Sequence, residues 1–326
     1  MKRKPSVLFT LFSLMTVACA GKAGVASVSS GNTFVSADSA VDSTEQPNTF
    51  DASGLENRLK EFVNGKDARI GVAVIVNGKD TVTVNGNREF PMMSVFKFPL
   101  ALVVANFTNR LGVDLNEKID ITPDELKENT YSPMLKKYGK HTLRLTLREL
   151  LEWSLQESDN NAADILLKYV GGVKGMTAYM GVMDMPAGIK VGASEDDMHR
   201  DPYLSYLNLS TPIDMAELFD DFRATVHERT KQFKEIAGMI ESCKTGTDRL
   251  YTPLKDTGAI LGHKTGTGDM LTPGRISAVN DCGYVKLPDG QYYSIAVFVA
   301  DSGYDMAETS GLIAEISEIV YEGITR

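Results

Sequence analysis

Different patterns of apolar residues follow one another along this chain of 326 residues. Residues 55–63 place apolar side chains at helical spacing and stop at an Asn-Gly pair, which is typical of a helix end. Residues 71–76 and 81–84 are runs rich in valine, separated by a second Asn-Gly pair, and this arrangement predicts a β-hairpin. This part of the chain therefore predicts one helix followed by two strands.

Helical spacing dominates the middle of the chain, from about residue 90 to residue 241, with loops between the apolar stretches. Strand patterns return at residues 259–264, 283–287 and 293–299, and an Asp-Gly pair between the last two predicts a second hairpin. Residues 308–321 return to helical spacing, with leucine and isoleucine on one face. Strands thus lie near both ends of the chain, and helices lie between them.

This order of elements predicts an α/β (α+β) fold in which one antiparallel sheet is built from both ends of the chain. Helices from the two ends would flank the sheet, and an all-helical domain would be inserted between its strands. The folded region is expected to cover residues 51–326, with residues 51–86 and 243–326 in the sheet-containing part and residues 87–242 in the helical part. A cleft is expected where the two parts meet, because ligand sites commonly lie at such seams.

The start of the chain indicates an export signal. Basic residues 2–4 precede an apolar run at residues 7–18, which is too short for a comfortable membrane-spanning helix. Residues 1–20 are interpreted as a signal peptide, and residues 21–50, rich in Ser, Ala, Gly and Thr, as a flexible linker. Cleavage at the A-x-A sequence that ends the signal would release a soluble protein, whereas acylation of Cys19 would anchor a lipoprotein. Both interpretations predict a periplasmic protein.

The composition is that of an ordinary globular protein, with 43% hydrophobic and 24% charged residues, and a monomer is expected. A formal net charge of −9 argues against a nucleic-acid-binding surface. The four histidines are scattered without metal-ligand spacing, so no metal is expected. Cys243 and Cys282 either pair or remain two buried thiols, and the sequence leaves both interpretations open.

Three short motifs occur in an informative order. S-x-x-K occupies residues 94–97, S-D-N occupies residues 158–160 and K-T-G occupies residues 264–266. Each motif alone is weak, but in this order and at these separations they form the active-site set of serine β-lactamases and penicillin-binding proteins. The chain resembles class A serine β-lactamases over roughly residues 55–326. The resemblance implies the serine β-lactamase/DD-peptidase-like fold and a reaction without a cofactor.

The resemblance also implies an activity. A class A enzyme would hydrolyse the β-lactam ring of penicillins and cephalosporins through a serine acyl-enzyme, and so confer resistance to them. A DD-peptidase or penicillin-binding protein is the alternative, because such proteins share the motifs but keep their acyl-enzyme for long periods. A non-catalytic β-lactam sensor domain would need a membrane-spanning signalling segment, and no second apolar run of about 20 residues is found.

Ser94 and Lys97 are spaced to act together. The apolar stretch from residue 95 to about residue 104 predicts a helix, so the two side chains lie one turn apart on one face. The helix N-terminus would offer backbone N–H groups to a developing oxyanion. The Lys97 amine could take the hydroxyl proton of Ser94, which is therefore the predicted nucleophile.

K-T-G occurs twice, at residues 244–246 and at residues 264–266, and only the second copy ends a predicted strand. The second copy is predicted to be functional, because substrate would lie along a strand edge by backbone hydrogen bonds. The resemblance implies four substrate-binding residues here: Lys264, Thr265, Gly266 and Thr267. The first two would bind the substrate carboxylate, and the last would complete the oxyanion site with the N–H of Ser94.

Four further residues have roles implied by the resemblance. Ser158 would pass a proton to the leaving lactam nitrogen, and Asn160 would bind the acylamide side chain of the substrate. Tyr131, in a Y-S-P sequence, would contact substrate from the opposite wall. Arg249, in a T-G-x-x-R sequence, is the candidate second cation for the carboxylate, with Arg275 as its rival.

A base for deacylation would distinguish a hydrolase from a penicillin-binding protein. Class A enzymes carry this base on a loop after S-D-N, and here Glu195 is predicted to fill the position. Asp196 is the alternative if the register slips by one residue. His199 stands where the usual E-x-x-x-N motif has Asn, which is similar to a cephalosporin-favouring branch of the class. The Asn280-Asp281 pair also matches that branch.

Overall fold

The structure is a computed structural model that describes residues 50–326. The predicted signal peptide, the acylation site at Cys19 and all but the last residue of the predicted linker lie outside the described residues. Between residues 50 and 326, no helix is long and apolar enough to cross a membrane. The described residues belong to one compact unit, and the division at residues 87 and 242 stays a prediction.

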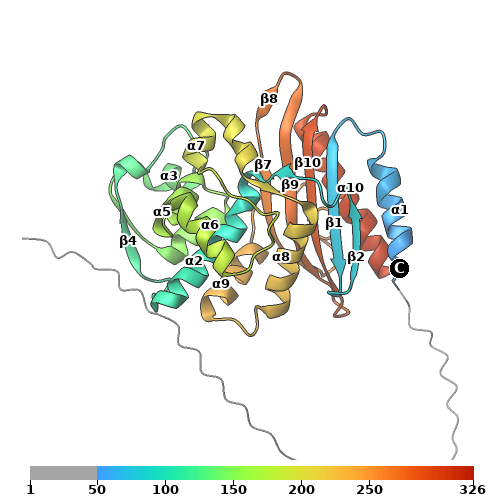
Figure 1. Cartoon of the computed structure of the whole chain (residues 1–326), viewed down its shortest axis with the longest axis horizontal. Helices are drawn as coiled ribbons and strands as arrows, with labels where there is room; N and C mark the ends of the chain where they lie inside the picture. The colour runs from blue at the N-terminus through green and yellow to red at the C-terminus, as the bar shows by residue number, and fades with distance from the viewer. Residues whose placement is uncertain (1–49) are drawn as a thin grey trace, which may run out of the picture. The chain divides into compact units, whose positions relative to one another are not determined.

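One antiparallel sheet forms the centre of the fold, with the strand order β2-β1-β10-β9-β7 and with β8 paired to β9 (Figure 1). The strands are β1 (Arg69–Val76), β2 (Asp80–Val84), β7 (Ile260–Thr267), β8 (Met270–Thr272), β9 (Arg275–Lys286) and β10 (Tyr292–Ser302). Strand β1 lies beside β10, with Val72 opposite Val297. The prediction of a sheet built from both ends of the chain is confirmed.

The valine-rich run of β1 is buried on both faces of the sheet. Alternate residues beginning with Ile70 pack in one hydrophobic cluster with α1 (Ala52–Val63) and α10 (Met306–Thr325). The intervening residues, such as Ala73, belong to a second cluster that extends into the helical part. Burial on both faces explains why this strand is continuously apolar instead of alternating.

The remaining helices lie on the other side of the sheet (Figure 1). They are α2 (Lys97–Leu111), α3 (Pro133–Tyr138), α4 (Leu147–Gln156), α5 (Asn160–Tyr169), α6 (Gly172–Val182), α7 (Glu195–Arg200), α8 (Pro212–Thr225) and α9 (Lys231–Glu241). Helix α8 packs against β1, β9 and β10, while α2 packs against α4, α5, α6 and α9. Helix α2 is apolar nearly all round because it is surrounded by other elements.

Strand β9 is longer than the sequence pattern predicted. Only its end, at residues 283–287, was expected, whereas the strand begins at Arg275. Polar residues at Ser277, Asn280 and Asp281 interrupt the apolar pattern, although all three are buried. The Asn280 amide donates to the Met92 carbonyl oxygen at 3.0 Å, and Asp281 Oδ1 lies 2.8 Å from His263 Nδ1. Ser277 Oγ and Asn280 Oδ1 are buried without a hydrogen-bond partner among the described residues.

Several short elements were not predicted. The pairs β3 (Phe90–Pro91) with β6 (Leu209–Ser210) and β4 (Lys118–Ile121) with β5 (Leu143–Thr146) form two small sheets. Three 3-10 helices are η1 (Met93–Phe96), η2 (Pro123–Glu125) and η3 (Pro202–Leu207). These pieces are too short to show a period in the sequence, but η1 and η3 both border the cleft described next.

Candidate active site

A cleft of about 600 Å³ opens beside the C-terminal end of β7. Most of the predicted site residues line it: Ser94, Tyr131, Ser158, Asn160, Glu195, His199, Arg249, Thr265 and Thr267. The other three predicted residues, Lys97, Lys264 and Gly266, are buried behind this lining. The structure therefore brings the whole predicted set together, with the two lysines beneath the cleft surface.

Ser94 lies in η1, which runs directly into α2. The preceding residue, Met93, has a φ of 47°, a left-handed conformation that is costly for a residue with a side chain. Gly266 lets β7 approach this turn, since a Cβ there would lie 2.4 Å from the Met92 carbonyl oxygen and 3.2 Å from the Ser94 nitrogen. Asn280 fixes the turn from β9 by donating to the Met92 carbonyl oxygen. The nucleophile position is thus held from two strands.

The amine of Lys97 is fully buried and lies within hydrogen-bond distance of three acceptors. They are Asn160 Oδ1 at 2.6 Å, the Ser158 carbonyl oxygen at 2.7 Å and Glu195 Oε1 at 2.8 Å. An ammonium group carries three N–H donors, so these three acceptors satisfy it. Burial of a charge is costly unless it is paired and hydrogen-bonded, and Lys97 therefore ties the S-D-N turn and α7 to the start of α2.

Glu195 is the first residue of α7, whose N-terminus is capped by the Ser194 side chain. Its Oε1 lies 3.2 Å from Ser94 Oγ, which donates to it, and 2.8 Å from Lys97 Nζ. The next residue, Asp196, lines a separate pocket and lies 3.5 Å from Arg200. Only the Glu195 register brings a carboxylate to Ser94, and its role as the base stays a prediction.

Asp164 on α5 holds the start of α7 in place. Its Oδ1 accepts the Glu195 N–H at 2.7 Å, and its Oδ2 accepts the Asp196 N–H at 2.8 Å. Burial, with a further contribution from the nearby Glu195 charge, raises the pKa of Asp164 to about 7, even though the two amide hydrogen bonds oppose this shift. Asp164 was not predicted as a site residue, because an acidic residue on a helix carries no recognisable signal in the sequence.

The turn between α4 and α5 presents S-D-N to the cleft. Ser158 has a φ of 57°, again in the left-handed region. Asp159 is fully buried and caps α5 by accepting the Ala162 N–H at 2.9 Å. Asn160 accepts from Lys97 and donates from Nδ2 to Thr130 Oγ1 at 2.9 Å. The amide that is predicted to bind substrate is therefore held in a fixed orientation by the protein.

The second K-T-G copy lies within β7, as predicted. Lys264 Nζ donates to Ser158 Oγ at 2.9 Å and to the Thr265 carbonyl oxygen at 2.8 Å. Burial, helped by the charge of Lys97, lowers the pKa of Lys264 to about 7 against the opposing effect of nearby negative groups. The Lys264 amine does not line the cleft, but its hydrogen bond to the Ser158 hydroxyl connects it to a residue that does.

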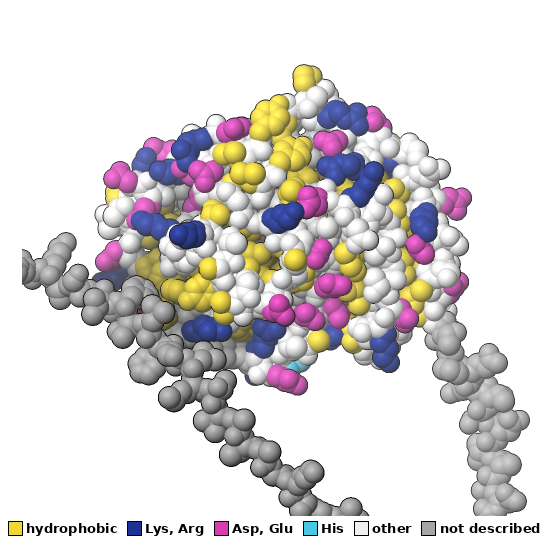
Figure 2. Space-filling view, in the orientation of Figure 1, with side chains coloured by type: hydrophobic (Ala, Val, Ile, Leu, Met, Phe, Trp, Pro, Cys, Tyr) yellow, Lys and Arg dark blue, Asp and Glu magenta, His cyan; other side chains and the backbone are white. Residues whose placement is uncertain are grey.

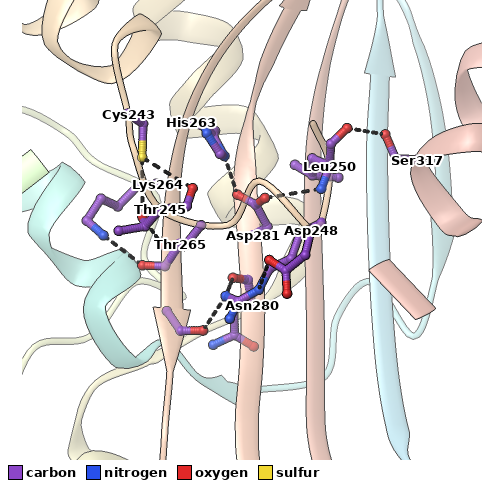
Figure 3. Close-up of polar contacts among 12 residues, drawn as sticks. Cys243, Thr245, Asp248, Leu250, His263, Lys264, Thr265, Asn280, Asp281 and Ser317 are labelled. Carbon is purple, nitrogen blue, oxygen red and sulfur yellow. Dashed lines mark hydrogen bonds and ion pairs between the residues drawn. The ribbon is translucent and has the colours of Figure 1, made fainter. Parts of the chain in front are cut away.

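The first K-T-G copy also contributes to the cleft, through its threonine and not through its lysine. Lys244 is exposed and pairs with Glu157 at 2.6 Å. Thr245 lines the cleft, and its Oγ1 lies 2.5 Å from Thr265 Oγ1 (Figure 3). The contact between the two threonines depends on the fold, and the repeated tripeptide alone does not predict it.

Arg249 and Arg275 occupy different environments. Arg249 lines the cleft, is 6% exposed, and donates to Thr267 Oγ1 at 2.7 Å and to the Gly266 carbonyl oxygen at 3.1 Å. Arg275 instead donates to Asp67 Oδ1 at 2.7 Å and is not among the residues that line the cleft. The geometry favours Arg249 as the second cation.

The outer rim of the cleft is partly apolar. Tyr131 is 53% exposed, and Leu271 of β8 also lines the cleft. Figure 2 shows apolar side chains at the end of the sheet over β8, where Met270 is 60% exposed. His199 lies on α7, four residues after Glu195, and faces the same cleft. This rim offers apolar surface to substrate groups that project from the reacting centre.

Cys243 and Cys282 are not bonded to each other. The interpretation as two free thiols is therefore confirmed, although only Cys282 is fully buried and Cys243 is partly exposed. Within residues 50–326, no three His, Cys, Asp or Glu side chains form a group that could hold a metal ion.

Comparison with known proteins gives one consistent result. The sequence model of a family described as the beta-lactamase enzyme family matches residues 54–324. A β-lactamase of Bacteroides uniformis is 36% identical over 274 residues, which make up 83% of this chain and 92% of that protein. The extended-spectrum β-lactamase PER-1 of Pseudomonas aeruginosa is 33% identical over 273 residues, which make up 82% of this chain and 86% of that protein.

Solved structures agree with the sequence comparisons. The crystal structure of a representative class A β-lactamase from Bacteroides cellulosilyticus superposes with a TM-score of 0.79 and 34% identity. The match covers 84% of this chain and 98% of that one. The likeness therefore includes nearly all of the residues that the structure describes.

Asp164 generates a prediction about pH. Its pKa is about 7 in the folded protein and about 3.9 in an unfolded chain, so the folded state alone keeps the proton between these values. The resulting stabilisation is complete below about pH 4 and is lost as the pH rises through about 7. The free energy of unfolding of the wild type should therefore fall relative to that of Asp164→Asn, by about 1–4 kcal/mol over this window.

Urea denaturation of both proteins at several pH values between 4 and 8 would measure this difference. Asp256 is exposed, and Asp256→Asn is the matched control. Its free energy of unfolding should change with pH in parallel with that of the wild type. Parallel curves for the wild type and Asp164→Asn would contradict the prediction.

Proposed function

Since the chain belongs to the beta-lactamase enzyme family, as a class A serine β-lactamase that hydrolyses β-lactams and confers resistance to them, we propose that Ser94 is its nucleophile and Glu195 its deacylating base. One observation carries this proposal. Glu195 Oε1 lies 3.2 Å from Ser94 Oγ and 2.8 Å from Lys97 Nζ. A carboxylate that is paired with an amine therefore lies within hydrogen-bond distance of the Ser94 hydroxyl.

Acylation begins when Ser94 Oγ attacks the lactam carbonyl carbon. Glu195 Oε1 is the direct acceptor of the Ser94 hydroxyl proton in this arrangement. Lys97 has its three donors engaged and acts first as a fixed positive charge that stabilises the Glu195 carboxylate. The developing oxyanion would lie between the N–H of Ser94, at the start of α2, and the N–H of Thr267, at the end of β7.

The lactam C–N bond then breaks, and its nitrogen needs a proton. Ser158 Oγ is proposed as the donor, because it faces the cleft and accepts a hydrogen bond from Lys264 Nζ at 2.9 Å. The lowered pKa of Lys264 makes its amine a suitable source of a replacement proton near neutral pH. The product of this stage is an ester between Ser94 and the opened lactam.

Deacylation needs Glu195 as a carboxylate again, so the proton that Glu195 took from Ser94 first passes through solvent in the cleft to the Lys264 amine, which gave up a proton through Ser158 during acylation. Glu195 takes a proton from a water molecule, the oxygen of that water attacks the ester carbonyl carbon, and the ester C–O bond breaks. Ser94 Oγ leaves and recovers a proton through Glu195. Asp164 supports this step by holding the N-terminus of α7, and with it Glu195, through two backbone hydrogen bonds.

The substrate carboxylate is proposed to bind at the far end of β7. Thr265 presents its hydroxyl there, Lys264 supplies a buried charge, and Arg249 adds a guanidinium fixed by Thr267 and the Gly266 carbonyl oxygen. A guanidinium gives directional hydrogen bonds that a second lysine would not reproduce. Asn160, Tyr131 and His199 are proposed to contact the rest of the substrate.

Two finer proposals concern substrate preference and location. His199, four residues after Glu195, and the Asn280-Asp281 pair support a preference for cephalosporins. The basic start and apolar run of the first twenty or so residues support export to the periplasm, either as a soluble protein or as a lipoprotein acylated at Cys19. A penicillin-binding protein is disfavoured, because Glu195 stands next to Ser94.

Glu195→Gln should separate the two halves of the reaction. Acylation of Ser94 should persist while deacylation slows by about 10²–10⁴-fold, the range for loss of a general base. Mass spectrometry after addition of a penicillin should then show a stable adduct on Ser94. Asp196→Asn is the matched control and should turn over like the wild type. An adduct trapped by Asp196→Asn, and not by Glu195→Gln, would move the base to Asp196.

Arg249→Ala should weaken catalysis through the carboxylate site. Loss of a hydrogen bond to a charged group costs about 1.5–3 kcal/mol, which corresponds to roughly a ten- to hundredfold fall in kcat/KM. Steady-state kinetics on one cephalosporin would measure this fall. Arg275→Ala is the control, because Arg275 pairs with Asp67 and should cost much less. A large loss at Arg275 with none at Arg249 would assign the carboxylate to Arg275.

A further inference from the structure

The first K-T-G copy, at residues 244–246, has no part in the reaction proposed above. It lies in the loop that follows α9, outside the strand that carries the second copy. Thr245 and Gly246 nevertheless line the cleft, and Figure 3 shows Thr245 beside Thr265 of β7. The contacts of this loop copy therefore bear directly on the residues that are proposed to bind the substrate carboxylate.

Lys244 ties the loop copy to the segment that leads into S-D-N. Its backbone N–H donates to the carbonyl oxygen of Gln156, the last residue of α4, at 3.0 Å. Its Nζ also pairs with Glu157 at 2.6 Å, but both side chains are partly exposed, and such ion pairs contribute little. The backbone hydrogen bond is thus the firmer restraint, and it limits where the next residue, Thr245, can lie.

Thr245 and Gly246 enclose the side chain of Thr265. Thr245 Oγ1 lies 2.5 Å from Thr265 Oγ1. On the other side, a Cβ on Gly246 would lie 2.4 Å from Thr265 Cγ2, and Gly246 has a φ of 70°, which favours glycine. The hydroxyl of Thr265 therefore faces Thr245, while its methyl group packs against Gly246. Because both substituents of the Thr265 Cβ are in contact, the loop copy holds this stiff side chain in one rotamer.

The direction of the hydrogen bond between the two threonines matters for an anion. A hydroxyl has one proton to donate and two lone pairs that accept. If Thr265 donated to Thr245, it would present only lone pairs to a carboxylate, which would repel them. If Thr245 donates to Thr265, the Thr265 proton is free to point at the carboxylate. Thr265 is 4% exposed, so water has little access to its side chain and Thr245 is its hydroxyl partner in the structure.

We propose that Thr245 is a positioning residue that acts through Thr265, by donating to Thr265 Oγ1 and so directing the Thr265 proton toward the substrate carboxylate. This role rests on the carboxylate binding proposed for Thr265. Hydrogen bonds in such a chain polarise and strengthen one another. The two copies of the tripeptide thus have different uses, since the copy on β7 binds the substrate and the loop copy orients the threonine that does so. The two hydroxyls act as one unit, and loss of either removes the same contribution.

A double-mutant cycle on the full-length enzyme tests this coupling. Valine has nearly the shape of threonine and lacks the hydroxyl, so the variants are Thr245→Val, Thr265→Val and the double variant. On one cephalosporin, Thr245→Val should lower kcat/KM roughly three- to tenfold, the range for one hydrogen bond, and Thr265→Val should lower it at least as much. The double variant should lie within about twofold of Thr265→Val, because residues that act through one contact are not additive.

Two further variants serve as controls. Thr245→Ser keeps the hydroxyl and should retain most of the wild-type kcat/KM. Thr247 is exposed and is not among the residues that line the cleft, so Thr247→Val should match the wild type. Thr245→Ala removes the same hydroxyl as Thr245→Val and replaces it in the cycle if the valine variant does not fold.

The dependence on the substrate carboxylate separates positioning from a merely structural role. The loss in Thr245→Val should require a free carboxylate on the substrate. With the methyl ester of the same cephalosporin, which lacks that charge, the wild type and Thr245→Val should differ by less than about twofold. An equal loss on the acid and on the ester would overturn the proposal.

Two outcomes of the cycle would also overturn it. One is a loss in Thr245→Val that is repeated in full in the Thr265→Val background, because the two hydroxyls would then act independently. The other is an impaired Thr265→Val beside a fully active Thr245→Val. Full activity in Thr265→Val would instead contradict the carboxylate-binding role proposed for Thr265, and with it the basis for the role of Thr245.

Discussion

The buried amine of Lys97 is the interaction on which the rest of the site depends. It has no exposure to solvent, and its three acceptors come from two segments far from it in the sequence, the S-D-N turn and the start of α7. The free-energy cost of removing a charge from water is offset only when well-placed partners form ion pairs and hydrogen bonds with it. The charge of Lys97 therefore requires Asn160 and Glu195 to stay where they are, and the position of Glu195 beside Ser94 follows from that requirement.

Lys264 is the second buried amine of the site. Lys264 lies behind the other side of the cleft, and burial with the Lys97 charge lowers its pKa to about 7. Two lysines near one cleft would repel each other unless negative groups lay nearby, and Glu195 and Asp281 supply that balance. The same arrangement separates the roles of the two amines. In the proposed mechanism, Lys97 stabilises the Glu195 carboxylate, whereas Lys264 exchanges a proton through Ser158.

Much of this site could be predicted from the sequence, because the three motifs are local and their order along the chain is informative. The sheet built from both chain ends was predictable too, since β1 and β10 are continuous apolar runs. The missing parts depend on tertiary contacts. Asp164 has no periodic or motif signal. Motifs do include Thr245 and the Asn280-Asp281 pair of β9, but no motif indicates the contacts of these residues, which are made with partners distant in sequence. The T-G-x-x-R sequence made Arg249 the candidate and left Arg275 as its rival, and their surroundings in the structure favour Arg249.

In the proposed mechanism, one cluster around Lys97 both forms the acyl-enzyme and hydrolyses it. Stopped-flow mixing of the purified protein with excess chromogenic cephalosporin tests this claim most directly, because it counts product molecules for each enzyme molecule. We predict sustained turnover that far exceeds one product per enzyme, and none in a folded Ser94→Ala variant. A single burst of one product per enzyme, or turnover that survives Ser94→Ala, would contradict it.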